Sequence, residues 1–131
     1  MGEITAGPGY AVGNLDAIGA GPGFRKIRRE LGVTAFGMNA IVLPPGYDTG
    51  SHYHEHQEET YFVHSGRIAI TFGDGTTHEL DPGGLARVDA TTVRNVRNIG
   101  TGDAIYVIVG GKDGYVGRDG VKVNPDGSEA R

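Results

Sequence analysis

Two histidines and a carboxylate lie close together in one short segment, residues 46–66, which reads GYDTGSHYHEHQEETYFVHSG. His52 and His54 are two positions apart, so on an extended strand both side chains project from the same face. Glu59 follows at a distance that a short turn could fold back toward them. Two imidazoles and a carboxylate make a metal site with open coordination positions, which suits non-heme Fe(II) and also accepts Mn, Ni, Cu or Zn.

The flanking residues indicate β-strands around this segment, whereas an HxH pattern by itself also arises by chance on solvated loops. A turn, LPPG, precedes the histidines, and an aromatic and β-branched stretch, TYFVHSG, follows Glu59. Strand alternation puts Glu59 and Tyr61 on one face and His64 on the other. We therefore expect Glu59 and Tyr61 to face the interior, where Tyr61 serves either as core or as a contact to a substrate. Glu58, His64 and His78 are expected outside the site. His56, in the loop between His54 and Glu59, either helps at the mouth of the site or is a solvated loop histidine, and we favour the second.

The same segment resembles the first sequence motif of the cupin family. That motif is a glycine, five residues, HxH, three or four residues, a glutamate, six residues and a glycine. The chain meets it without a gap at Gly46, His52, His54, Glu59 and Gly66. The resemblance implies an all-β fold, the double-stranded β-helix or jelly-roll barrel, with His52, His54 and Glu59 as metal ligands.

The second cupin motif is met only in part. Gly83 and Asn98 fit it, but Asp89, Thr91 and Arg94 stand where a proline, a glycine and a histidine are usual. That histidine is the fourth protein ligand in metal-binding cupins, and arginine cannot replace it because a guanidinium has no lone pair to give.

Arg94 therefore leaves three interpretations open. In the first, three residues hold the metal while Arg94 and Tyr61 bind a small anionic substrate. In the second, the site holds no metal and Arg94 pairs with Glu59. In the third, Arg94 turns out to solvent. If Arg94 points inward, alternation puts Val96 on the inner wall as well.

Short β-type segments separated by turns run through the middle of the chain, and turns account for its 24 glycines. Gly73-Asp74-Gly75 is a hairpin signal between two of these segments. The expected strands are 40–43, 61–63, 67–72, 77–80, 86–88, 93–96 and 104–109. We expect a single domain over residues 1–131, with the barrel core at about 35–110 and both ends packing outside it.

The ends of the chain give weaker signals. Arg25 to Leu31, RKIRREL, permits either a single helical turn or an exposed edge strand. The N-terminal stretch is expected on the surface or along a neighbouring subunit. After Gly110 we expect loop that could hold a late strand, and neither end shows residues whose chemistry we can identify.

Composition excludes several classes of partner. Lys and Arg total 12 against 16 Asp and Glu, a formal net charge of -4, which gives no basic footprint for nucleic acid. No apolar run approaches the roughly 20 residues that span a bilayer, and the chain has no cysteine for disulfides. We expect a cytoplasmic protein, and the resemblance to cupins implies a homodimer.

Two hypotheses about function follow. In the first, the chain is a small metal-dependent enzyme of oxygenase or isomerase type, with Glu59, Tyr61 and Arg94 as the candidate catalytic residues. In the second, the barrel is a metal-free module that binds a small molecule without catalysis. A purely structural barrel ranks lowest, because a histidine pair and an inward carboxylate are costly to bury without a role.

Overall fold

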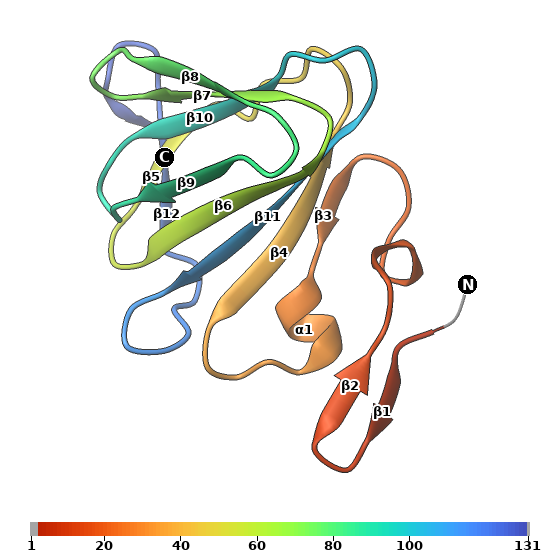
Figure 1. Ribbon diagram of the computed structural model, residues 1–131. Helices are drawn as coiled ribbons and strands as arrows, with labels where there is room; N and C mark the ends of the chain where they lie inside the picture. The colour runs from red at the N-terminus through yellow and green to blue at the C-terminus, as the bar shows by residue number, and fades with distance from the viewer. Residues whose placement is uncertain (1–2, 131) are drawn as a thin grey trace.

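Two antiparallel β-sheets face each other in the computed structural model of this protein, which describes residues 3–130 (Figure 1). One sheet has six strands in the order β13-β12-β5-β10-β7-β8, and the other has five in the order β3-β4-β11-β6-β9. A separate hairpin, β1 (Thr5–Gly7) and β2 (Tyr10–Val12), lies away from the two sheets. This is the expected jelly-roll fold, with antiparallel pairing throughout.

The strands match the expected positions in the middle of the chain and extend most of them. The bounds in the five-stranded sheet are β3 Gly23–Arg25, β4 Gly37–Leu43, β6 Glu58–Ser65, β9 Leu85–Val88 and β11 Ala104–Gly111. Those in the six-stranded sheet are β5 Ser51–His54, β7 Ile68–Phe72, β8 Thr77–Leu80, β10 Arg94–Asn98, β12 Gly120–Val123 and β13 Glu129–Ala130.

The hydrophobic core fills the space between the sheets, and strand alternation decides which residues enter it. Strand β6 alternates exposed and buried residues along most of its length, which puts Tyr61 and Val63 inside. Strand β10 buries Val96 between Arg94 and Asn98, as alternation predicted for an inward Arg94. The core residues are Ile41, Leu43, Tyr61, Val63, Ile68, Ile70, Val88, Val96, Ala104 and Tyr106.

Two turns fix how the core strands follow one another. The predicted hairpin joins β7 to β8 through Gly75, whose φ of 87° only glycine adopts without strain. Between β6 and β7, Gly66 has a φ of 76°, and a Cβ there would lie 2.7 Å from the Ala104 Cα. Gly66 therefore meets two demands at once, a left-handed backbone and close approach to strand β11.

The two ends contain more regular structure than the sequence indicated. The RKIRREL segment takes the helical alternative, as helix α1 (Ile27–Leu31) with Ile27 buried, and strand β3 ends at its first residue, Arg25. A 3₁₀ turn, η1 (Leu15–Ala17), precedes them. Across residues 3–130 no helix has the length and apolar character to cross a membrane.

The segment after Gly110 was expected as loop that could hold a late strand, and most of its regular structure joins the six-stranded sheet. Strand β12 pairs with β5 over the four residues of each strand, with Gly120 opposite His54 and Lys122 opposite His52. The other neighbour of β5, strand β10, is in register with it only at Arg94 and His52. The C-terminal segment thus supplies most of the pairing that holds the strand with both histidines.

Candidate metal and ligand site

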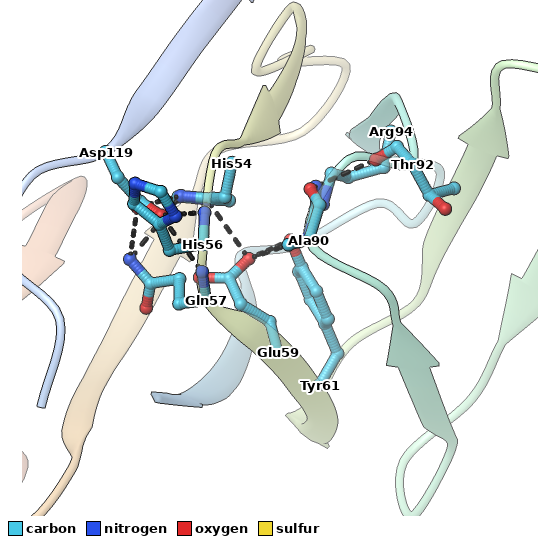
Figure 2. A network of polar contacts seen from close by, with 9 residues as sticks. All are labelled: His54, His56, Gln57, Glu59, Tyr61, Ala90, Thr92, Arg94 and Asp119. Carbon is cyan, nitrogen blue, oxygen red and sulfur yellow. Dashed lines mark hydrogen bonds and ion pairs between the residues drawn. The ribbon is translucent and has the colours of Figure 1, made fainter. Parts of the chain in front are cut away.

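The five side chains singled out in the sequence meet between the two sheets, and Figure 2 shows four of them, all but His52. The six-stranded sheet contributes His52 and His54 from β5 and Arg94 from β10. The five-stranded sheet contributes Glu59 and Tyr61 from β6. Each sheet therefore brings part of the site, and the closing of the barrel assembles it.

Glu59 is the centre of this group, and its Oε1 atom receives every polar contact that residues 3–130 make to its carboxylate. The Tyr61 hydroxyl donates to it at 3.0 Å and the Arg94 Nη2 at 3.3 Å. The His54 Nε2 lies 3.3 Å from the same oxygen. The second oxygen, Oε2, accepts no hydrogen bond from residues 3–130.

Arg94 is fully buried, with no exposed surface, so the interpretation that turned it out to solvent is wrong. Its Nη1 donates to the Ala90 carbonyl at 3.0 Å and to the Thr92 carbonyl at 2.8 Å. Its Nη2 reaches Glu59, whereas its Nε is buried and finds no hydrogen-bond partner within residues 3–130. An orphaned buried donor is rare in native structures, and here it belongs to a charged group.

His52, His54 and Glu59 are close enough to hold one ion together. Each offers a ligand atom, and these three atoms lie within 4.8 Å of one another. The two imidazole rings meet edge to face, with their centroids 5.1 Å apart. Two imidazoles and one carboxylate with no thiolate form a donor set that fits Fe, Mn, Ni, Cu or Zn.

The charge states of His52 and Glu59 suit a cation, whereas His54 holds its proton more strongly and must release it to bind one. Burial, aided by the Arg94 charge, lowers the pKa of His52 to about 4, so its lone pair is free at neutral pH. Burial opposes ionisation of Glu59, but contacts with His54, Arg94 and Tyr61 outweigh it and lower its pKa. Burial likewise opposes charging of His54, yet Glu59 and Asp119 outweigh that and raise its pKa.

Sequence reasoning missed three residues around the site. Asp119 and Gln57 contact His54, at 2.7 Å and 3.4 Å from its Nδ1. Tyr106 on β11 stacks on Tyr61 inside the barrel, with ring centroids 6.0 Å apart. Alternation in the run AIYVIVGG could have identified Tyr106, but no local pattern indicates Asp119, which lies 65 residues from His54.

The residues expected outside the site do lie outside it. His56, His64 and His78 are exposed, and exposed Glu58 pairs with Arg87 on the outer face of its sheet. Burial raises the pKa of Tyr61, and its hydroxyl uses Glu59 as its acceptor.

The barrel of this protein is similar to those of several solved structures. A cupin protein from Bacteroides fragilis is 22% identical, with a TM-score of 0.69 over 85% of this chain and 91% of that one. A conserved Klebsiella pneumoniae protein with a double-stranded β-helix domain is 26% identical, with a TM-score of 0.57 over 60% and 69%. The DMSP lyase DddQ from Ruegeria pomeroyi is 18% identical, with a TM-score of 0.62 over 72% and 46%.

Several other similar structures are longer than this chain, which spans between 44% and 57% of their length. No curated protein sequence matches the chain. The family model for the cupin domain matches residues 39–110, which contain both motif regions and the five site residues. This match covers more than half of the sequence, and the barrel has the fold of solved cupins, so the chain belongs to the cupin family.

Proposed function

We propose that this protein is a small enzyme that depends on a divalent transition-metal ion and acts on a small anionic substrate. His52, His54 and Glu59 would hold the ion. The observation that carries the proposal is the approach of their three ligand atoms to within 4.8 Å of one another, beside a fully buried arginine. When bound, such an ion supplies Lewis-acid or oxygen-binding chemistry.

Arg94 supports the anionic character of the substrate. The loop carbonyls occupy its Nη1, and Glu59 takes its Nη2, whereas its buried Nε has no partner among residues 3–130. Nε and Nη2 share one edge of the guanidinium, the edge that a carboxylate or enolate oxygen can engage. A substrate oxygen at this edge would give the buried Arg94 Nε the acceptor that residues 3–130 do not provide.

Glu59 and Tyr61 have different roles in this proposal. The lowered pKa of Glu59 keeps it ionised, which suits a ligand and argues against a general acid. Burial raises the pKa of Tyr61, so its hydroxyl stays protonated at neutral pH. It could donate to developing negative charge on a substrate by exchanging its bond to Glu59 for one to the substrate. Arg94 would orient the substrate, and the Tyr61 hydroxyl, 3.0 Å from Glu59, would supply such a contact.

The Arg94–Glu59 ion pair favours a second candidate, a metal-free barrel that binds an anionic ligand without catalysis. At 3.3 Å the guanidinium already balances the charge of Glu59, so the site is electrostatically satisfied without an ion. Metal content separates the two candidates.

Elemental analysis of the purified protein and of two histidine variants provides that test. We expect about one ion per chain in the wild type after loading with Fe(II), Mn(II), Ni(II) or Zn(II), and loss of the ion in His52→Ala. His64→Ala is the matched control, because His64 is exposed on the outer face of β6. An ion content near zero in all three proteins after loading would leave the metal-free candidate.

A binding measurement tests the substrate half separately. Small carboxylates, titrated into the metal-loaded protein and followed by NMR, should bind the wild type more tightly than Arg94→Lys. The lysine keeps the positive charge but lacks the planar fork. Equal binding by both proteins would remove Arg94 from the substrate contact.

The homodimer implied by the family resemblance stays a prediction. Phe62, Leu85 and Val109 are exposed on the outer face of the five-stranded sheet, a face that could take part in it. Light scattering coupled to size-exclusion chromatography measures the mass directly, and a monomer at all working concentrations would contradict the prediction.

A further inference from the structure

Asp119, in the segment between β11 and β12, makes four hydrogen bonds to the outer side of the candidate site (Figure 2). Its Oδ1 lies 2.7 Å from the His54 Nδ1 and accepts from the Gln57 Nε2 at 2.7 Å. Its Oδ2 accepts from the backbone N–H groups of His56 at 2.8 Å and Gln57 at 3.0 Å. One carboxylate thus contacts both the ring of a candidate ligand and the loop that follows it.

Strand pairing places this carboxylate with little freedom. The Asp119 carbonyl accepts from the Glu55 N–H at 3.1 Å, and the next residue, Gly120, lies opposite His54 in the β12–β5 register. Asp119 is itself buried, and so is most of the His54 ring. The backbone pairing on both sides of the contact therefore fixes the position of the Asp119 carboxylate relative to the His54 ring.

The chemistry of the contact determines which ring nitrogen of His54 carries the proton. An ionised carboxylate can only accept, so Asp119 at Nδ1 and Glu59 at Nε2 compete for the one proton of the neutral ring. The Asp119 contact is much the shorter, 2.7 Å against 3.3 Å, which favours the proton on Nδ1. The other nitrogen, Nε2, then has its lone pair on the side of Glu59, 3.3 Å away, where the three candidate ligand atoms converge.

We propose that Asp119 is a positioning residue, which fixes His54 in the Nδ1–H tautomer and aims its Nε2 lone pair into the barrel. The role of that lone pair as a metal ligand rests on the proposed function, whereas the tautomer can be measured without any metal. Outer carboxylates that hold a histidine in this way are a general means of preparing a metal ligand.

The two oxygens of Asp119 separate this positioning role from a purely structural one. Oδ2 anchors the loop through two backbone N–H groups, and Oδ1 faces the ring. In Asp119→Asn the two backbone donors require the amide oxygen to occupy the Oδ2 position, because an amide nitrogen there would meet two N–H groups. The amide nitrogen must then face the ring, where it donates to Nδ1, and the Gln57 amide can turn to present its oxygen.

The substitution therefore keeps the loop anchored and reverses the tautomer of His54. The experiment is ¹⁵N NMR of the imidazole rings in metal-free protein, at a pH high enough for the ring of His54 to be neutral. We expect the proton on Nδ1 in the wild type and on Nε2 in Asp119→Asn. A wild-type proton on Nε2 overturns the proposal, and that measurement needs no variant to fold. An Asn variant that folds and keeps the wild-type tautomer overturns it as well.

Zinc affinity provides a second readout, measured with Zn(II) alone by competition with a chromophoric chelator. The protonated Nε2 of Asp119→Asn should weaken zinc binding about 10- to 100-fold. The matched control is Asp126→Asn, because Asp126 lies in the same C-terminal segment and the one residue within 3–130 whose groups donate to its side chain is Ser128. Equal zinc affinity in wild type and Asp119→Asn overturns the positioning role.

The two proposals fail in distinguishable ways. A wild type that binds no ion at all, with His54 still in the Nδ1–H tautomer, refutes the metal-dependent function and retains the orientation of the ring by Asp119. A wild type that binds zinc while its metal-free ring carries the proton on Nε2 retains the metal site and refutes the role of Asp119.

Discussion

Replacing Arg94 with methionine tests whether the buried guanidinium is an integral part of the site. Methionine keeps much of the length and apolar volume of the arginine stem, so the change removes mainly the charge and its hydrogen bonds. Glu59 loses its cationic partner, and the Thr92 carbonyl loses the donor that reaches it at 2.8 Å. The Ala90 carbonyl still accepts from the His54 N–H at 2.8 Å, so it keeps a partner.

The geometry sets the size of the effect. At the observed Nη2 to Oε1 distance of 3.3 Å, unit charges attract by about 5 kcal/mol with an effective dielectric constant of 20. Removing one partner of a buried pair costs about 3 to 5 kcal/mol in practice, because it leaves the other charge uncompensated. Since the Arg94 side chain has no exposed surface and the Glu59 side chain only 10%, little solvent screening reduces this value.

The assay is urea unfolding of metal-free protein at pH 7, followed by circular dichroism. We expect the free energy of unfolding of Arg94→Met to be lower by about 3 to 5 kcal/mol. Arg97→Met is the control, because Arg97 is exposed on the opposite face of the same strand, and its change should stay within about 0.5 kcal/mol. A loss below about 1 kcal/mol for Arg94→Met would refute the assignment of Arg94 as the counter-charge of Glu59.

Three further changes test other parts of the structure. Asn98 bonds three backbone groups from a buried position, so Asn98→Ala should cost about 2 to 4 kcal/mol by urea unfolding, whereas Asn95→Ala on the outer face should cost much less. Gly66→Ala places a Cβ at a φ of 76° and 2.7 Å from the backbone of β11, so it should lower the free energy of unfolding by about 2 to 4 kcal/mol in the same assay. Gly102→Ala is its control and should change this free energy little, because a Cβ at Gly102 has no atom within 4 Å. Burial is the main reason that the pKa of His52 is about 4 in the folded protein, against 6.5 in the unfolded chain. Between pH 6.5 and pH 4 the unfolded chain therefore binds a proton at His52 that the folded protein does not. The free energy of unfolding of the metal-free protein should fall by up to roughly 3 kcal/mol as the pH drops through this window. Removing the imidazole in His52→Gln should flatten this slope, and an unchanged slope would contradict the assignment.

Local sequence patterns predicted the part of the structure that depends on strand alternation and turns. Alternation along β6 predicted that Glu59 and Tyr61 face the interior. Alternation along β10 predicted that Val96 faces the interior if Arg94 does. The hairpin between β7 and β8 followed from its Gly-Asp-Gly turn. These features are encoded within a few residues, so one sequence suffices to read them.

Contacts across long sequence separations could not be read in this way. Asp119 belongs to the site only because β12 pairs with β5, and nothing in the residues around Asp119 indicates that partner strand. The interpretation of the segment after Gly110 as mostly loop therefore left out a neighbour of His54. The conformation of Arg94 was undecided for a related reason, because its carbonyl partners come from the geometry of a loop that the sequence does not specify.

That loop accommodates the most consequential departure from the second cupin motif, Arg94. Asp89, Thr91 and Arg94 replace the usual residues within six positions, and the carbonyls of the residues between them, Ala90 and Thr92, both accept from the Arg94 guanidinium. The Ala90 carbonyl also accepts from the His54 N–H, so one loop conformation satisfies the arginine and holds the ligand strand. A buried guanidinium is tolerated only when such acceptors surround it. Arg94 is therefore fitted to its loop, to Glu59 and to the strand with the two histidines, as expected of a residue with a role in the site.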